Sequence, residues 1–429
     1  MVAAGSKRRD GGRGEAYPAR VVEDPGSWGS GSAGTGFEGG HRFVVELGPA
    51  PPRELRNLMA SAETVERYGW TLEPVRLGRG AESGSRVRVL IPGPVGAAVG
   101  GRSLASRQLI PVASLALEAI ERYRRTTPRT LRLAHGHTLT VGGRTLVMGI
   151  VNVTPDSFYD GGRYATTEAA VEQGLRLAAE GADLLDIGGE STRPGAPEVR
   201  ATEESRRVLP VLRALRKKLD LPLSIDTRKS SVAQAALEAG ASLVNDVGGL
   251  GDARMRRLVA RADAAAVVMH MRGGPRTMQR DTRYDDLRSE VFRFLWQRTR
   301  EAERAGVGSD QLLVDPGIGF GKSPEGSLEL LSHVRELRSL GYPVLLGASR
   351  KSFLKALGGG ERAEDRLHAS VSAAVFASLR GAEIVRVHDV APTVEALKVA
   401  DAVRAGVAAS RDREGTRARL RRVGRRSVG

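Results

Sequence analysis

The chain has 429 residues and a formal net charge of +16, and 41% of its residues are hydrophobic but only 4% are aromatic. It contains no cysteine, which excludes disulfides, thiolate metal sites and a cysteine nucleophile. No run of about 18 apolar residues is present, and the basic start MVAAGSKRRDGGRG precedes no apolar segment, so we predict neither a membrane span nor a secretory signal and expect a cytoplasmic protein.

The first 130 residues differ in composition from the rest of the chain. Residues 1–40 are rich in Gly, Ser and Arg, as in GSWGSGSAGTGFEGG, and lack the apolar surface that would order them, so we expect a disordered segment. Residues 41–130 are predicted to form a small α/β accessory module without any chemical motif. Its expected strands are 43–47 and 87–91, and its expected helices are 55–69 and 109–125.

Residues 131–408 predict a (β/α)8 TIM barrel of the α/β class, which begins with a β-hairpin at 131–143. Repeated strand–helix units of about 30 residues favour a closed barrel. The alternative, a doubly wound open sheet, usually has a Gly-rich first turn, and no GxGxxG follows the first strand. The predicted strands are 146–152, 184–190, 223–227, 243–249, 265–271, 312–318, 344–349 and 384–389. The predicted helices are 167–180, 203–219, 230–239, 253–262, 285–305, 325–340, 365–380 and 392–405.

The C-terminal tail, residues 409–429, is strongly basic. From Arg411 to Gly429 it holds eight arginines against two acidic residues, a net charge of +6. Such tails are usually solvated and disordered, and some bind nucleic acid. We do not expect nucleic acid as a partner, because no aromatic side chain accompanies these charges.

Each predicted barrel strand ends in polar residues, at the end where barrel enzymes carry their active sites. A single polar strand end is most simply the N-cap of the next helix. Polar residues at all eight ends instead indicate side chains that converge on one site. They include Asn152, Asp186, Asp226, Asn245, His270, Asp315, Lys351 and Arg386.

Two carboxylates and an amide, those of Asp226, Asp315 and Asn245, suit a flat heterocycle. Such groups pair with the amino and ring N–H groups of a guanidine-like edge, and a site built this way rejects analogues that lack them. Two alternatives remain open. Asp315 could cap a helix or support the loop DPGIGFGKS, and Asn245 could be a buried structural amide.

A second group is cationic and suits an oxyanion such as diphosphate. It consists of Lys351, Arg386 and His388, with Arg193 on a long loop. Asn152 offers a single protein oxygen to Mg²⁺, which can suffice because this ion keeps several waters. A lone histidine is more often structural, but His388 lies two residues from Arg386 and therefore on the same face of its strand.

Two Gly- and Pro-rich loops, 152–164 and 188–197, are predicted to close over substrates and exclude water. The segment GFGKS at 319–323 is superficially similar to a phosphate loop. It lacks GxxxxGK[ST], so we reject that interpretation.

Eight segments occur in the order and at the spacing of the dihydropteroate synthase family, which the chain resembles over residues 146–406. They are NVTPDSFYDGG, DIGGESTRPGA, SIDT, NDVGG, MHMRGGPRTMQ, DPGIGFGKS, GASRKSF and RVHDV. The resemblance implies a pterin-binding transferase of folate biosynthesis. In this family 7,8-dihydropterin-6-ylmethyl diphosphate condenses with 4-aminobenzoate, which sulfonamides mimic, to give dihydropteroate and diphosphate. The resemblance also implies that Mg²⁺ is the cofactor and that the protein is a homodimer.

The matching motif positions imply a role for each candidate residue. The pterin-binding positions are Asp226, Asn245, Asp315, Lys351, Met269 and Phe320. The diphosphate positions are Arg386 and His388, with Asn152 as the Mg²⁺ ligand. The aminobenzoate positions are Phe158, Thr192, Arg193, Pro194 and Ser352. The expected catalytic residues are Asp160, Arg193 and Lys351, with Asp160 stabilising the cation that forms when the C–O bond to diphosphate breaks.

Two other functions are alternatives. A non-catalytic pterin-binding paralogue would keep the pocket and lose its loop residues, yet Asn152, Thr192, Arg193 and Pro194 are all present. A corrinoid-dependent methyltransferase would need neither an aminobenzoate site nor a diphosphate site. One departure from the family is Tyr159, where Ser is more usual, which could change the affinity for aminobenzoate or sulfonamides.

Overall fold

The computed structural model describes residues 19–22, 41–50, 71–75, 85–92, 111–153, 163–191, 195–358 and 360–406. The chain divides into two units, Met1–Tyr123 and Arg124–Gly429. The predicted boundaries at 130 and 408 stay predictions, and the tail 409–429 and the helix expected at 55–69 lie outside the described residues.

The first unit contains a four-stranded antiparallel sheet in the order β1-β2-β4-β3. Its strands are β1 (Ala19–Val22), β2 (His41–Ala50), β3 (Thr71–Val75) and β4 (Ser85–Pro92), and helix α4 spans Pro111–Arg124. The strands expected at 43–47 and 87–91 lie within β2 and β4. Strand β1 falls in the segment expected to be disordered, and its order comes from pairing with β2. Opposite residues Arg20 and Glu46 form a buried ion pair of 2.7 Å there.

The second unit is the predicted barrel, with eight parallel strands in the order β12-β11-β10-β9-β8-β7-β14-β13. A parallel bridge between Val314 and Val344 joins the two ends of this sheet and closes the ring. The strands are β7 (Leu146–Asn152), β8 (Leu184–Gly188), β9 (Leu223–Asp226), β10 (Leu243–Asp246), β11 (Ala265–Met269), β12 (Leu312–Asp315), β13 (Leu345–Leu346) and β14 (Ile384–Val387). Most are shorter than predicted, because the polar residues that follow them belong to loops.

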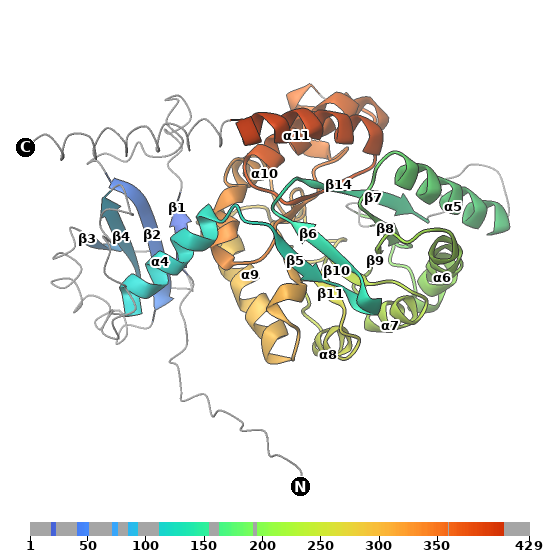
Figure 1. Cartoon of the computed structure of the whole chain (residues 1–429), viewed down its shortest axis with the longest axis horizontal. Coiled ribbons are helices and arrows are strands. Elements are labelled where there is room, and N and C mark those ends of the chain that lie inside the picture. Colours follow the sequence, from blue (N-terminus) through green and yellow to red (C-terminus); the bar gives the residue numbers. More distant parts are fainter. Residues whose placement is uncertain are drawn as a thin grey trace, which may run out of the picture. The chain divides into compact units, whose positions relative to one another are not determined.

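Helices surround this ring (Figure 1). They are α5 (Arg163–Ala179), α6 (Ala201–Lys218), α7 (Ser230–Glu238), α8 (Ala253–Arg261), α9 (Leu287–Arg304), α10 (Pro324–Ser332), α11 (Leu367–Leu379) and a helix over 390–406. The single helix predicted over 325–340 is interrupted. Helix α10 ends at Ser332. The backbone of the next residue, His333, leaves the helical region, and the 3₁₀ helix η5 (Val334–Leu340) follows.

The predicted β-hairpin is confirmed as β5 (Arg129–Arg132) and β6 (Thr138–Val141). Its apolar side chains Leu131, Leu139 and Val141 pack in one buried cluster with the first residues of the barrel strands, including Leu146 and Ile384. In Figure 1 the hairpin crosses in front of the strand ring. The hairpin therefore closes the amino-terminal end of the barrel, which leaves the carboxyl end for a site.

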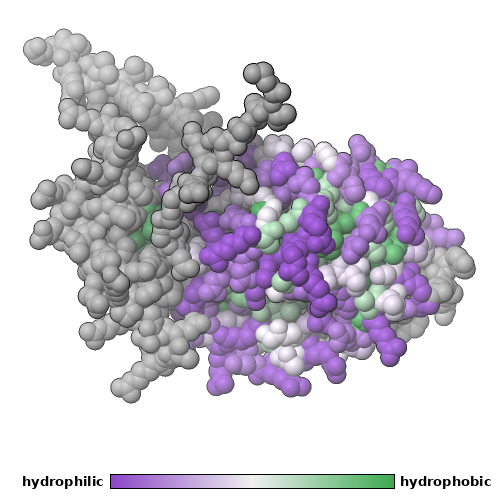
Figure 2. All heavy atoms as spheres, turned by 90° about the horizontal axis from the view of Figure 1, so that it is seen from below, coloured by the Kyte–Doolittle hydropathy of each residue, from purple (hydrophilic) through white to green (hydrophobic). Residues whose placement is uncertain are grey.

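The outer surface of the barrel is mostly hydrophilic on the face that Figure 2 shows, and apolar residues are scattered among the charged ones. The helices achieve this by burying one stripe each, as in α6, whose buried residues include Val208, Val211 and Leu215. None of the helices that the structure describes is long and apolar enough to cross a membrane.

Candidate active site

Predicted site residues stand side by side at the carboxyl ends of neighbouring strands. Asn152 is in register with Gly188, Gly188 with Asp226, and Asp226 with Asn245. Side chains at paired positions of neighbouring strands project to the same face of a sheet, so these residues share one level of the barrel. A Cβ at Gly188 would lie 3.4 Å from the Cβ of Asp226, so the glycine keeps this level open.

A buried polar network joins four strands at this end of the barrel. The Arg386 Nε donates to Asp186 Oδ2 at 2.6 Å, and its Nη2 donates to Asp226 Oδ2 at 2.7 Å. The Asn245 Nδ2 also donates to Asp186 Oδ2, at 2.9 Å. One guanidinium thus lies between two carboxylates, and we call these four residues the central network.

In the central network, burial disfavours the charged forms of the side chains, whereas neighbouring opposite charges favour them. Burial raises the pKa of Asp226 to about 7, although the charge of Arg386 opposes this shift. Burial also disfavours the charge on Arg386, but Asp186 and Asp226 raise the pKa of its guanidinium above the usual value. Arg386 is therefore a permanent cation, and Asp226 is the member that titrates near neutral pH.

The sequence placed Asp186 among the polar strand ends but predicted no binding role for it. It is fully buried, and its Oδ2 accepts hydrogen bonds from both Asn245 and Arg386. Its Oδ1 has no hydrogen-bond partner among the described residues. The available signal was a charged residue within the apolar strand LLDIG, since a buried carboxylate needs a partner.

Asp315 and Lys351 form a second part of the site. The buried Asp315 accepts a hydrogen bond from the Gly317 backbone N–H at 2.7 Å, so one carboxylate oxygen does support the loop, as the alternative for this residue proposed. Burial raises the pKa of Asp315, and the charge of Lys351 opposes this effect.

The charges that act on Lys351 are those of the carboxylates Asp315 and Asp226 and of the cation Arg386. Its Nζ donates to the Ile318 carbonyl and lies 4.5 Å from the centroid of the Phe320 ring. Burial lowers its pKa to about 8, with the charge of Asp315 opposing the shift. Lys351 and Phe320 together can therefore form one wall for a flat ring.

The remaining described candidates are His388, Met269 and Ser352. The His388 Nδ1 lies 3.0 Å from Ser349 Oγ, which also accepts the His388 backbone N–H at 3.2 Å. Met269 is buried and in register with Asp315, and Ser352 begins the 3₁₀ helix η6 (Ser352–Leu357) directly after Lys351.

The two Gly- and Pro-rich loops, 152–164 and 188–197, are only partly described. Phe158, Asp160, Thr192, Arg193 and Pro194 lie outside the described residues.

The base of the second loop is held firmly by Glu190. Its Oε1 accepts the Val199 backbone N–H at 3.1 Å, and its Oε2 accepts from Lys229 Nζ at 2.6 Å. This residue thereby joins both ends of the segment that contains 192–194.

The donor set fits Mg²⁺ bound mainly through a substrate. Among the described residues there is no group of three or more His, Cys, Asp or Glu that could hold a metal ion. Asn152, half-buried at the end of β7, offers one amide oxygen beside the central network. Mg²⁺ commonly takes one or two protein oxygens together with phosphate oxygens and water.

Known proteins resemble this chain over the barrel. Residues 148–388 match the family described as pterin binding enzyme. The dihydropteroate synthase of Synechocystis is 43% identical, with 61% of this chain and 91% of that protein covered. A probable bifunctional folylpolyglutamate synthase/dihydropteroate synthase of Haloferax volcanii is 48% identical, but this chain spans only 31% of its length and the match covers 61% of this chain.

Solved structures of a dihydropteroate synthase are also similar to this chain. The Xanthomonas albilineans dihydropteroate synthase with 4-aminobenzoic acid is 51% identical and has a TM-score of 0.61, with 65% of this chain and 99% of that chain covered. A second structure of the same enzyme holds 7,8-dihydropteroate, at 49% identity and a TM-score of 0.58, with 64% of this chain and 99% of that chain covered.

Proposed function

The chain belongs to the dihydropteroate synthase family of pterin-binding transferases, and from this we propose that it condenses 7,8-dihydropterin-6-ylmethyl diphosphate with 4-aminobenzoate. The products are dihydropteroate and diphosphate, in folate biosynthesis. The observation that supports this most is the central network, because it sets acceptors for a heterocycle directly beside a permanent cation. The structure of a relative with 7,8-dihydropteroate bound agrees with this proposal.

The pterin ring is proposed to lie between the two polar parts of the site. Asp226 and Asp315 would accept hydrogen bonds from its amino and ring N–H groups, and Asn245 would orient it through its amide. The Lys351 ammonium and the Phe320 ring form the wall described above, and Met269 would pack near the ring.

The diphosphate is proposed to lie beside Arg386 and His388. Asn152 would hold Mg²⁺, and this ion, when bound, would supply positive charge to the leaving diphosphate. Arg386 can donate hydrogen bonds to the anion from the guanidinium N–H groups that do not bind Asp186 or Asp226. Fixed charges aimed at the leaving group are a large catalytic contribution.

The chemical step needs no strong base. The C–O bond to diphosphate breaks, its electron pair leaves with the diphosphate, and the cation is shared with the pterin ring. The neutral amine of 4-aminobenzoate then attacks in line, and its nitrogen releases a proton. We assign Asp160 to the cation, and Phe158, Thr192, Arg193, Pro194 and Ser352 to the aminobenzoate, on the family resemblance alone.

The kcat/KM for the pterin substrate is expected to follow a bell-shaped pH profile. The proposal requires Asp226 as carboxylate and Lys351 as ammonium, whose pKa values are about 7 and about 8. Activity is therefore lost as the pH falls through about 7, because Asp226 gains a proton, and as it rises through about 8, because Lys351 loses one. Steady-state rates between about pH 5 and about pH 10 test this. A flat profile over that range would contradict the assignment.

An assay with both substrates and Mg²⁺ separates the enzyme from the non-catalytic pterin-binding paralogue. We expect the purified chain to form dihydropteroate, detected by mass spectrometry. Intact pterin binding without product would favour the paralogue. Methyl transfer to a cobalamin acceptor would instead favour the methyltransferase alternative. The homodimer also stays a prediction, which light scattering can test.

A further inference from the structure

A buried lysine in the loop after β12 has no part in the mechanism above. Lys322 is 3% exposed, and its Nζ lies within hydrogen-bond distance of four groups. It donates to the carbonyls of His270, Pro316 and Gly317 at 2.9, 2.8 and 2.9 Å, and lies 2.8 Å from His270 Nδ1. This set of partners holds the loops after β11 and β12 together.

The three carbonyl partners of Lys322 favour its ammonium form. Carbonyl oxygens only accept, and three carbonyls match the three N–H groups that an ammonium carries. Burial lowers the pKa of Lys322 well below its usual value, while the carboxylate of Asp315 favours the charged form. Burial first, and then the charge of Lys322, lowers the pKa of His270 to about 2, so its imidazole is neutral and Nδ1 can share one of these N–H groups as a second acceptor.

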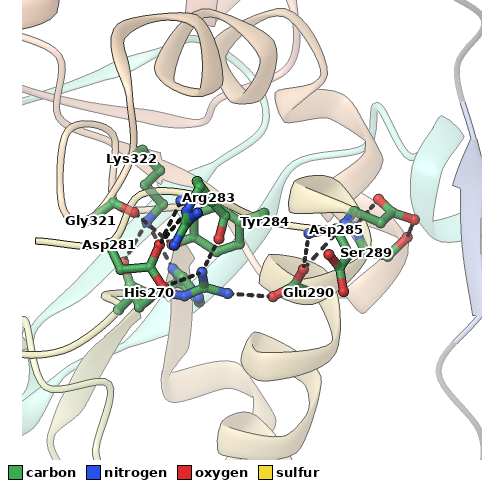
Figure 3. A network of polar contacts seen from close by, with 11 residues as sticks. His270, Asp281, Arg283, Tyr284, Asp285, Ser289, Glu290, Gly321 and Lys322 are labelled. Carbon is green, nitrogen blue, oxygen red and sulfur yellow. Dashed lines mark hydrogen bonds and ion pairs between the residues drawn. The ribbon is translucent and has the colours of Figure 1, made fainter. Parts of the chain in front are cut away.

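The two loops are also fitted to each other around Lys322 (Figure 3). The Tyr284 hydroxyl donates to the Gly321 carbonyl at 2.7 Å, and Gln279 Nε2 donates to the Gly319 carbonyl at 2.8 Å. At Gly317, where φ is +68°, a Cβ would lie 2.0 Å from the His270 carbonyl oxygen. Only glycine permits such an approach of two backbones, so the fit between the loops is specific.

The clamped segment is the one that carries the pterin side of the site. The Gly317 N–H binds Asp315, the Ile318 carbonyl accepts from Lys351, and the Phe320 ring faces the same lysine. Lys322 fixes the peptide groups of Pro316 and Gly317, which lie between Asp315 and Ile318. A shift of these peptide groups would displace Asp315 and Lys351, which are both proposed to contact the pterin ring.

We propose that Lys322 is a positioning residue for pterin binding, which acts by clamping the loop after β12 against the loop after β11. This inference rests on the proposed function, since it concerns the same pterin site. Lys322 touches no substrate in the proposed mechanism. Its effect should appear in the affinity for the pterin and not in the aminobenzoate site, which is built on other loops.

The test compares Lys322→Met with wild type by calorimetry with the pterin diphosphate alone and by steady-state kinetics. The expected result is a Kd and KM for this substrate raised about tenfold or more, because small misplacements of binding groups are costly. The KM for 4-aminobenzoate and the kcat at saturating pterin should change less than about threefold. Tyr284→Phe, which removes a single hydroxyl from the same clamp, should shift the pterin KM in the same direction by less.

A control separates positioning from loss of stability. Val259→Ala removes buried volume from α8, a helix that contributes no residue to either loop, and should lower the Tm without raising the pterin KM. An unchanged pterin Kd in both Lys322→Met and Tyr284→Phe would overturn the inference. If Lys322→Met does not fold, Tyr284→Phe decides it. A wild-type chain that binds the pterin but makes no dihydropteroate contradicts the proposed function alone, because the calorimetric comparison still tests the clamp.

Discussion

Asp226→Asn is expected to raise the Kd of the pterin substrate about 100-fold, equal to ~3 kcal/mol of binding free energy. Asparagine keeps the shape of the side chain but replaces a charged acceptor with a neutral amide, one end of which only donates. The change also takes one carboxylate from Arg386, whose Nη2 lies 2.7 Å from Asp226 Oδ2. Calorimetry with the pterin substrate measures the effect directly.

The matched control for this variant is Asp310→Asn. Asp310 lies on the 3₁₀ helix η4 (Ser309–Gln311), which precedes β12 at the amino-terminal end of the barrel, and it pairs with Arg132 of the hairpin at 2.6 Å. The same chemical change there should leave the pterin Kd unaltered. Wild-type affinity in Asp226→Asn would show that the pterin does not bind where the central network lies.

Arg386→Met is expected to lower kcat/KM about 1,000-fold, since a buried cation shared by two carboxylates and a leaving anion is removed. It should also move the acidic limb of the pH profile to higher pH. The charge of Arg386 lowers the pKa of Asp226, so without it that pKa rises from about 7 to a higher value and the carboxylate is protonated at a higher pH. The measurement is kcat/KM across the same pH range as for wild type.

Arg132→Met is the control for the arginine, because this residue pairs with Asp310 and Asp263 far from the strand carboxyl ends. It should leave both the rate and the pH profile unchanged. An Arg386→Met variant whose acidic limb stays in place would mean that Asp226 is not the group titrating there. Near-normal activity would remove Arg386 from the mechanism.

The barrel could be predicted from the sequence because its signals are local. Each strand is a short apolar run, each helix has its own apolar stripe, and the polar strand ends mark the rim. Strand β1 was not predicted because its four residues, ARVV, are too few to show a strand pattern. Its order comes from pairing with β2. The break at His333 was missed because the apolar spacing continues through it.

The residues of the candidate site could be predicted from the sequence, but most contacts between them could not. The sequence indicated that Lys351 and Arg386 are cations at the rim, but it did not indicate that Arg386 lies between Asp186 and Asp226, or that Lys351 lies against Phe320. Pairings between residues as distant in sequence as Asp186 and Arg386 depend on the closed ring of strands. The buried position of Lys322 likewise appears only when the two loops are brought together.

Diphosphate release by the full chain, measured with and without 4-aminobenzoate, tests the central claim most directly. The proposed reaction predicts one diphosphate for each dihydropteroate when both substrates are present, and dihydropteroate only when 4-aminobenzoate is added, with both signals lost in Arg386→Met. Release of diphosphate without any dihydropteroate when both substrates and Mg²⁺ are present, or no release under these conditions, would contradict the proposal that this barrel joins the two substrates.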